Sequence, residues 1–379
     1  MPDEPASIEI RAVELREVAL PLVRPFRTSF GEESEKRCIL VRVDAGDHVG
    51  WGECVADVEP RYSGEWNAAA WESLAAFLVP SVVAGGPVTA PQQVAERTSW
   101  VRGHPMAKAA LEMAVLDAWL RRREARLSEF LGAVRDRVPC GVSVGIAASP
   151  AAMLEEIEGY LAKGYQRVKL KIEPGRDLAV VRAVRDALPD IPLSVDANAA
   201  YTLADTPLFE ALDEIGLVMI EQPLGHDDLV DHAKLQARLR TPICLDESIR
   251  HAHDALAAIE LGACRIINIK PGRVGGLLQA KRVHDVARER DVPVWIGGML
   301  ETGIGRATNV AMAALPGVTM PGDTSASERY FHRDLTAPFV VAGDGTMEVP
   351  TGPGIGVEPL EDALEACTVR VGSAEVEKL

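Results

Sequence analysis

Positive charge is in short supply in this 379-residue sequence. Its 40 lysines and arginines are outnumbered by 56 aspartates and glutamates, which gives a formal net charge of -16, and the basic residues are dispersed. Because nucleic-acid binding requires a basic stripe, this composition argues against a nucleic acid as partner. An acidic surface of this kind mainly promotes solubility.

Cysteine is also scarce, and no two of the six cysteines form a CxxC pair. We interpret them as reduced core residues of a cytoplasmic protein, because most lie in apolar, strand-like runs. The first residues, 1–5, are acidic and lack the apolar centre of a secretory signal. We also expect no apolar stretch long enough to span a membrane, and hence no membrane partner. The cysteines are Cys38, Cys54, Cys140, Cys244, Cys264 and Cys367.

Hydrophobic residues, in contrast, make up 47% of the chain, enough for a large core. Residues 7–57 favour antiparallel strands, and helical patterns follow at 66–78, 91–101 and 106–122. Strands followed by helices are typical of an α+β domain. We therefore predict an α+β domain at residues 1–133.

The rhythm of the sequence changes from residue 134 onward, where short β-branched runs alternate with amphipathic helical patterns. Repeated βα units indicate a parallel sheet, and the runs are numerous enough for a (β/α)8-type barrel at residues 134–325. An open doubly wound sheet is the alternative. We expect the segment 326–379, with a strand at 339–341, to pack back on the first domain. The candidate barrel strands are 140–144, 167–171, 192–195, 217–220, 242–245, 265–269, 293–296 and, less clearly, 317–320.

Charged residues end five consecutive strands of this predicted barrel. In chain order they are Lys171, Asp196, Glu221, Asp246 and Lys270. A charge at the end of a buried strand is costly unless it has a function. The second and sixth strands of an eight-stranded barrel are opposite each other, so the two lysines should face one another across the three carboxylates. An open sheet would not gather five strand ends around one centre.

Three carboxylates held together repel one another and require a cation. A set of oxygen ligands suits Mg²⁺ or Mn²⁺, which would stabilise the enediolate formed when a proton α to a carboxylate leaves. We expect burial and neighbouring cations to lower the lysine pKa from about 10.4, so that neutral amine acts as a base near pH 7. Lysines on opposite faces of one carbon have the geometry of a racemase.

Simpler interpretations exist for each residue taken alone. A single carboxylate after a strand is most often a helix N-cap, so the metal site is favoured by the succession of all three. Glu247 could replace Asp246 as a ligand, although strand alternation should allow only one of them to point inward. Lys169 could merely neutralise the carboxylates, and Arg273 could equally be a surface loop residue.

Five segments of the sequence are similar to segments of a known family. Because of these segments, the chain resembles the enolase superfamily, in the muconate-lactonizing-enzyme subgroup that has a lysine-x-lysine on the second barrel strand. It is most similar to the N-acylamino acid (N-succinylamino acid) racemase / o-succinylbenzoate synthase family. The resemblance covers the whole chain. The segments are PFRTSFG at 25–31, GWGEC at 50–54, KLKIEPG at 169–175, NIKPGRVGG at 268–276 and GGMLETG at 297–303.

The resemblance implies that residues 1–133 form a capping domain over the barrel and that the enzyme is a racemase with o-succinylbenzoate synthase activity. It implies Lys171 and Lys270 as the acid/base pair, and Asp196, Glu221 and Asp246 as ligands of Mg²⁺ (or Mn²⁺). Loops around Phe26 and Trp51 would close over a small-molecule carboxylate substrate, and we expect a homo-oligomer. The implied supporting or substrate-contacting residues are Lys169, Asn198, Arg273, Ser143, Phe26, Gly298 and Met299.

Related activities are the alternatives. A mandelate-type racemase would need a histidine near the seventh strand, and the run 293–297 has none. A dipeptide epimerase typically has two aspartates, one residue apart, after the eighth strand, whereas residues 322–325 contain only Asp323. A muconate-type cycloisomerase would use the same lysines and metal. Outside the enzymes, a metal-dependent binding protein on a retired barrel is the alternative.

Overall fold

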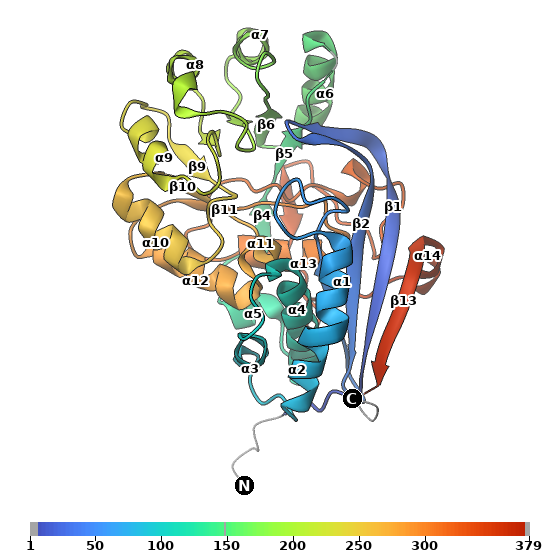
Figure 1. Cartoon of the computed structure of the whole chain (residues 1–379). Coiled ribbons are helices and arrows are strands. Elements are labelled where there is room, and N and C mark those ends of the chain that lie inside the picture. The colour runs from blue at the N-terminus through green and yellow to red at the C-terminus, as the bar shows by residue number, and fades with distance from the viewer. Residues whose placement is uncertain (1–6, 148, 376–379) are drawn as a thin grey trace.

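The computed structural model describes residues 7–147 and 149–375, and it contains an antiparallel sheet and a curled parallel sheet, each packed with helices (Figure 1). The acidic residues 1–5, on which the expectation about a secretory signal depends, lie outside the described residues. The first and last described parts of the chain meet in the antiparallel sheet, in which the strand order is β13-β1-β2-β3. Its strands are β1 (Ala12–Thr28), β2 (Gly31–Asp44), β3 (Val49–Cys54) and β13 (Thr368–Glu375).

Helices cover one face of this antiparallel sheet. Among them, α4 approaches β3 so closely that a side chain on Gly50 or Gly52 would meet a helix carbonyl at 2.0 Å. Glycine at these two positions therefore permits the contact between helix and sheet. The helices of this part of the chain are α1 (Asn67–Ser73), the π-helical η1 (Leu74–Leu78), α2 (Val79–Ala84), α3 (Gln92–Arg97), α4 (Pro105–Arg121) and α5 (Leu127–Leu131), the last of which contacts α13 (Gly303–Ala313) of the barrel.

One continuous helical segment, Asn67–Ala84, contradicts the expectation that no stretch is long enough to span a membrane. Its 18 residues have a mean hydropathy of 1.3, so length and composition alone would permit a span. The same segment buries Trp71, Leu74 and Leu78 in the hydrophobic core beneath the antiparallel sheet, which we call the capping sheet. The neighbours of the segment there are α4 and β2. The buried face thus accounts for its hydrophobicity within the folded chain.

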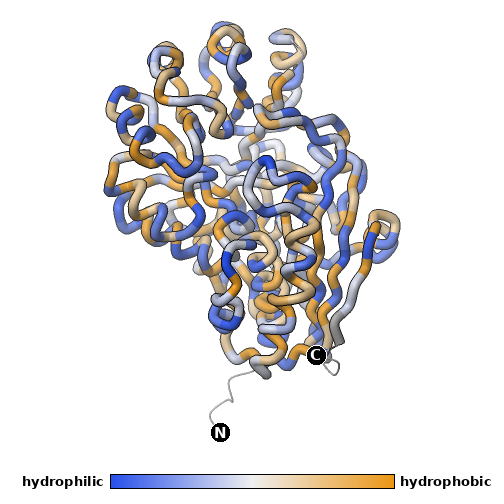
Figure 2. The backbone as a smooth tube through the Cα atoms, in the orientation of Figure 1, coloured by the Kyte–Doolittle hydropathy of each residue, from blue (hydrophilic) through white to orange (hydrophobic). Residues whose placement is uncertain are grey.

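The parallel sheet contains seven strands in the order β11-β10-β9-β8-β7-β6-β5, which agrees with the predicted modified barrel. In Figure 2, hydrophobic and hydrophilic segments alternate along the helices around it, as expected for helices that pack only one face on a sheet. The strands are β5 (Gly141–Val144), β6 (Arg167–Lys171), β7 (Leu193–Asp196), β8 (Ile220–Glu221), β9 (Ile243–Leu245), β10 (Ile266–Ile269) and β11 (Val294–Ile296). The helices are α6 (Pro150–Ala162), α7 (Leu178–Ala187), α8 (Thr206–Asp213), α9 (Leu229–Gln236), α10 (Ala252–Leu261), α11 (Pro271–Val274), α12 (Leu277–Arg288) and α13 (Gly303–Ala313).

The predicted eighth strand at 317–320 is wrong. In its place, single parallel bridges join Val318 to Val294 and Gly322 to Cys140, and these bridges close the ring between β11 and β5. The proline at 321 has no N–H to donate, and Gly317 has a positive φ of 84°, so a regular ladder cannot form there. The predicted strand at 339–341 is also absent. The tail instead forms β12 (Thr346–Glu348), which pairs with β4 (Arg137–Pro139), and α14 (Glu361–Cys367) before β13.

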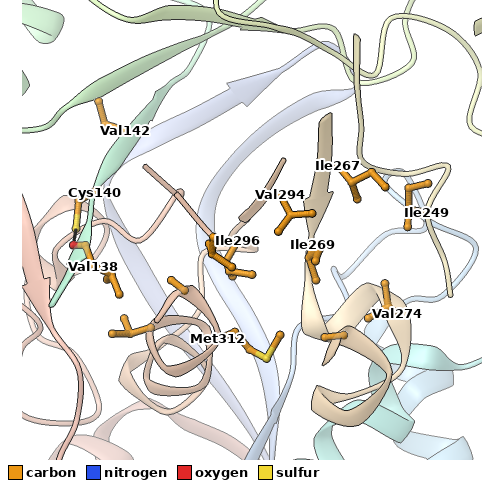
Figure 3. Packing of buried hydrophobic residues seen from close by; sticks show 14 of the residues in the cluster. Val138, Cys140, Val142, Ile249, Ile267, Ile269, Val274, Val294, Ile296 and Met312 are labelled. Atoms are coloured by element: carbon orange, nitrogen blue, oxygen red, sulfur yellow. Dashed lines mark hydrogen bonds between the residues drawn. The ribbon is translucent and has the colours of Figure 1, made fainter. Parts of the chain in front are cut away.

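Alternation along the barrel strands separates the hydrophobic packing from the charged interior. Figure 3 shows Ile267 and Ile269 of β10 in one hydrophobic cluster with Val274 and Met312 of the helices. The intervening Asn268 instead points into the barrel, where its amide reaches Glu221. The same period of two brings Lys169 and Lys171 to one face of β6.

Candidate active site

A cavity of about 340 Å³ lies where the capping sheet meets the C-terminal ends of the barrel strands. The tip of the β1–β2 hairpin docks there: the Ser29 hydroxyl donates to the Ala197 carbonyl at 3.2 Å, and Ile146 N–H donates to the Arg27 carbonyl at 3.0 Å. Eight of the sequence-predicted site residues line this cavity: Phe26, Ser143, Lys169, Lys171, Asn198, Lys270, Gly298 and Met299. The predicted ligands Asp196, Glu221 and Asp246 are fully buried and do not line the cavity, but each contacts a lysine that does.

Lys171 lies on one flank of the cavity. Its Nζ donates to Asp196 Oδ2 at 2.6 Å and to Asn198 Oδ1 at 2.8 Å. Although burial opposes ionisation of Asp196, Lys171 and then Lys169 hold the pKa of this carboxyl well below its ordinary value. Asn198 follows the end of β7 with a positive φ of 44°, and its N–H donates to Asp196 Oδ1 at 3.0 Å, so the local turn fixes both residues beside the lysine.

Lys169 lies one layer deeper and joins three carboxylates. Its Nζ is 2.8 Å from Glu221 Oε2, 3.2 Å from Asp196 Oδ2 and 2.7 Å from Asp323 Oδ2. Despite the opposing effect of burial, Asp323, Glu221 and Asp196 raise the pKa of Lys169 well above its ordinary value. These carboxylates therefore favour the charged form of Lys169 in the interior. Its predicted neutralising role agrees with these contacts.

Glu221 occupies the centre of the carboxylate cluster. Asn268 Nδ2 donates to Glu221 Oε1 at 2.7 Å, while Lys169 contacts the other oxygen. Burial and the charge of Asp196 raise the pKa of Glu221 to about 8, although Lys169 opposes this effect. The protein's own cations thus leave this carboxylate incompletely compensated.

Lys270 lies on the opposite flank of the carboxylates from Lys171. Its Nζ is 2.8 Å from Asp246 Oδ2, 3.2 Å from the Tyr62 hydroxyl and 3.5 Å from Met299 Sδ. The Tyr62 ring also lies 4.5 Å from this ammonium group, and its hydroxyl donates to Asp246 Oδ1 at 2.9 Å. Tyr62 comes from the capping loop after β3, so the two sheets share this flank.

The expected lowering of the lysine pKa depends on a bound cation, which acts in addition to the protein's own groups. Among the protein's own groups, burial acts to lower the pKa of Lys270, but Asp246 and then Tyr62 and Glu247 raise it well above its ordinary value. A divalent cation held by Asp246 would compete with this contact and would shift the pKa of Lys270 in the expected direction. The lowering therefore stays a prediction for the metal-loaded enzyme.

Arg273 is buried and is not a surface loop residue. It lies in the short helix α11, where Nε donates to the Ile249 carbonyl at 2.7 Å and Nη2 donates to the Asn268 carbonyl at 2.6 Å. A third nitrogen contacts Asp246 Oδ1 directly. Arg273 therefore does not line the cavity but holds a predicted metal ligand from below.

Asp246 and Glu247 both face the site, contrary to the expectation from strand alternation. Strand β9 ends at Leu245, and Gln222 Oε1 then accepts from Asp246 N–H at 3.0 Å and from Ser248 N–H at 3.2 Å. This bend brings Asp246 to Lys270 and Glu247 to Asn198, whose Nδ2 donates to Glu247 Oε1 at 2.9 Å. Burial and the charge of Asp246 raise the pKa of Glu247 to about 7.

Cationic side chains of the protein contact each of the predicted metal ligands. Among residues 7–147 and 149–375, no group of three His, Cys, Asp or Glu side chains is arranged to hold a metal ion. The donor set nevertheless fits a hard divalent cation, because it consists of buried carboxylate oxygens that already attract the ammonium groups of Lys169, Lys171 and Lys270. Two further buried oxygens nearby, Glu247 Oε2 and Asn268 Oδ1, have no hydrogen-bond partner.

Sequence reasoning missed one aromatic residue of the site. Tyr62 was not predicted, and only its position shortly after the GWGEC segment could have suggested it. The loop around Trp51 was expected to close over the substrate, and the loop that follows β3 does line the cavity. Trp51 itself is a packing residue of β3, whose N–H donates to Asp117 at 2.9 Å.

Comparison with known proteins shows the family to which the chain belongs. Residues 10–132 match the family described as mandelate racemase / muconate lactonizing enzyme, N-terminal domain, and residues 152–363 match the family described as enolase C-terminal domain-like. The chain therefore belongs to the enolase superfamily, as the resemblance in its sequence predicted. Members of this superfamily are enzymes that use a divalent metal, typically Mg²⁺.

Individual relatives are similar to the chain over nearly its whole length. The chain is 53% identical over 362 residues to an N-succinylamino acid racemase of Amycolatopsis, covering 95% of this chain and 98% of that protein. It is 52% identical over 353 residues to an o-succinylbenzoate synthase of Geobacillus stearothermophilus, covering 93% and 94%. A solved structure of an enolase-superfamily member from Listeria innocua has a TM-score of 0.93 at 38% identity and covers 97% and 100%.

Proposed function

We propose that this enzyme removes the proton α to a carboxylate and racemises N-acylamino acids, N-succinylamino acids above all, with o-succinylbenzoate synthesis as a second activity. The observation that carries the proposal is the pair of lysines on opposite flanks of one cavity, Lys171 beside Asp196 and Lys270 beside Asp246. The names of relatives at about half identity support the same substrate class. A relative that makes o-succinylbenzoate also suggests a place in menaquinone biosynthesis.

Asp196, Glu221 and Asp246 would hold the divalent cation, Mg²⁺ or Mn²⁺. When bound, the cation supplies positive charge to the substrate carboxylate and thereby acidifies the α-proton. Lys169 remains paired with Asp323 at 2.7 Å and contributes a fixed charge beneath the substrate. Gly298 and Met299, Ser143 and Phe26 would enclose the substrate, because they line the cavity without charge.

Lys171 and Lys270 exchange roles with the direction of reaction. One lysine, as neutral amine, takes the α-proton from its face, and the other, as ammonium, returns a proton to the opposite face of the enediolate. The orienting contacts differ, because Asn198 holds Lys171 and Tyr62 holds Lys270. In the dehydration reaction Lys171 takes the proton and then assists loss of hydroxide, while Lys270 contributes its positive charge.

Asp323 argues against the dipeptide epimerase alternative. A substrate ammonium would need a free carboxylate at this position, but Asp323 pairs with Arg167 at 2.7 Å and with Lys169 at 2.7 Å. Its pKa lies below the ordinary value because, against the effect of burial, Lys169 and Arg167 favour the carboxylate. An N-acylated amino group carries no charge and needs no such partner.

We further propose a cytoplasmic enzyme that acts as a homo-oligomer on a small carboxylate, without nucleic acid or membrane as partner. All six cysteines are free thiols, and five of them are buried, which suits a reducing compartment. Light scattering of the purified protein measures the mass of the assembly.

Proton NMR of N-succinyl-L-phenylalanine in D₂O with enzyme and Mg²⁺ tests the proposal. We expect the α-proton signal to disappear while the D-isomer accumulates, and Lys171→Ala and Lys270→Ala to abolish racemisation. No exchange from a folded, Mg²⁺-loaded enzyme would refute the acylamino acid assignment. The dehydration substrate and then a muconate would be tested next, whereas ligand binding without turnover of any of them would indicate the binding-protein alternative.

A further inference from the structure

A chain of three buried side chains runs from Lys171 away from the cavity. Lys171 Nζ donates to Asn198 Oδ1 at 2.8 Å, and Asn198 Nδ2 donates to Glu247 Oε1 at 2.9 Å. The relative exposures of Lys171, Asn198 and Glu247 are 8%, 9% and 9%, so water competes little for these contacts. Glu247 does not line the cavity, and its hydrogen bond toward the cavity is the one to Asn198, which does.

The orientation of the Asn198 amide decides whether this chain favours Lys171. In the observed orientation, the oxygen of the amide faces an ammonium group and its nitrogen faces a carboxylate. A rotation by half a turn would place NH₂ against the ammonium and oxygen against the carboxylate, and both contacts would become repulsive. Glu247 therefore selects the orientation in which Asn198 accepts from the lysine.

The position of Glu247 is itself fixed by the backbone. Gln222 accepts from the N–H groups of Asp246 and Ser248, the residues on either side of Glu247. Asn198 is held from the other side, because its N–H donates to Asp196 at 3.0 Å. The contact between Asn198 and Glu247 thus joins two rigid turns, one after β7 and one after β9.

We propose that Glu247 is a positioning residue for Lys171 that acts by fixing the Asn198 amide. The inference rests on the proposed function, in which each lysine serves one face of the substrate. Lys270 is oriented by Tyr62, Asp246 and Met299 and does not contact Asn198. Loss of the Glu247 carboxylate removes one of the charges that raise the pKa of Lys270 but none of the contacts that orient it, so it should slow proton transfer mainly on the Lys171 face.

Exchange of the α-proton with retention of configuration measures proton transfer on each face of the substrate separately. Racemisation in either direction needs both lysines, whereas exchange with retention uses one. Each enantiomer of N-succinylphenylalanine is followed by proton NMR in D₂O with Mg²⁺, using wild type, Lys171→Ala, Glu247→Met and Glu247→Gln. Lys171→Ala identifies the enantiomer that depends on Lys171. Absence of exchange from the wild type would refute the proposed function itself and is thereby distinguished from failure of the inference.

We expect Glu247→Met, which keeps side-chain length but offers Asn198 only a weak, uncharged thioether acceptor, to slow exchange of the Lys171-dependent enantiomer about tenfold or more. The other enantiomer should be slowed by no more than about twofold, because the contacts that orient Lys270 remain. Glu247→Gln, which keeps an acceptor oxygen, should restore much of the lost rate. Calorimetric titration with Mn²⁺ shows whether metal affinity is retained. Equal slowing of both enantiomers, lost Mn²⁺ binding or no slowing at all would overturn the inference.

Discussion

Glu53 of β3 connects the capping sheet to the barrel, and its replacement should lower stability in a way that the structure quantifies. Its side chain, 1% exposed, accepts from Thr302 N–H at 3.0 Å, from the Thr302 hydroxyl at 2.7 Å and from Gly305 N–H at 2.9 Å. These donors belong to the first turn of α13, directly after the segment with Gly298 and Met299. Thr302 is the N-cap of α13, and Glu53, from the other sheet, adds a second acceptor for the N–H groups at this helix N-terminus.

Glu53→Leu preserves side-chain size and removes every acceptor. Two backbone N–H groups then stay buried without a partner, at about 1–3 kcal/mol each. The carboxylate itself is costly to bury, since desolvation raises the pKa of Glu53 to about 7 in spite of the Thr302 hydrogen bonds. We therefore expect a net loss of about 3 kcal/mol in the free energy of unfolding, and about half of that for Glu53→Gln, which keeps one acceptor oxygen.

Equilibrium urea unfolding followed by tryptophan fluorescence measures both variants. Glu9→Leu is a matched control, because Glu9 is exposed, and it should change stability by less than about 0.5 kcal/mol. A loss below about 1 kcal/mol for Glu53→Leu would show that water or a backbone shift satisfies the α13 donors. The reasoning about a shared cap would then be refuted.

Three further perturbations test other parts of the structure. Tyr62→Phe removes the hydroxyl that contacts Lys270 and Asp246, and we expect kcat for racemisation to fall about tenfold with the fold retained by circular dichroism. Burial raises the pKa of Glu112 to about 7 from 4.5, so the folded state binds this proton more tightly than the unfolded state. The free energy of unfolding of the wild type should therefore fall by up to about 3 kcal/mol, relative to that of Glu112→Gln, between pH 4.5 and pH 7. Urea unfolding measures both proteins, and a difference in free energy that stays constant with pH would contradict this. Gly297→Ala would place a Cβ 2.3 Å from Asn268 Oδ1, and we expect weaker Mn²⁺ binding by calorimetry because Asn268 is pushed away from Glu221.

Strand periodicity carried most of the correct prediction. Lys169 and Lys171 share one face of β6, and the register pairs Lys171 with Asp196 and Asp196 with Glu221, so charged ends of consecutive strands do converge. The hydrophobic residues between them fix this register, because a shift by one residue would turn the lysines toward the helices. The convergence of these charged side chains could therefore be predicted from the local sequence.

Contacts made after the strands end were not readable in this way. Glu247 reaches Asn198 only because Gln222 bends the chain after β9, and Tyr62 reaches Lys270 only because the capping loop folds over the barrel. The same limit explains the pKa of Lys270, which depends on a direct contact with Asp246 whose length no spacing rule supplies. Local periodicity predicts which face a side chain takes, and tertiary contacts decide its partner.

The balance of charge in the site predicts that metal and substrate strengthen each other's binding. Five carboxylates are paired in direct contact or through Asn198 with five cationic side chains: Asp196, Glu221, Asp246, Glu247 and Asp323 against Arg167, Lys169, Lys171, Lys270 and Arg273. A divalent cation alone adds two positive charges to this buried cluster, and an N-succinylamino acid alone adds two negative charges. Either change is costly in a low-dielectric interior, whereas the two together cancel.

We expect N-succinylphenylalanine to raise the affinity for Mn²⁺ at least about fivefold, the low end of typical coupling between two sites, and Mn²⁺ to raise substrate affinity by the same factor. Calorimetric titrations in both orders measure the two factors on the Lys171→Ala Lys270→Ala double variant, which lacks turnover. Because this variant also removes two of the five cations, a matched titration with Lys171→Arg Lys270→Arg tests whether charge balance is responsible. Independent binding of metal and substrate to the arginine variant would contradict the argument.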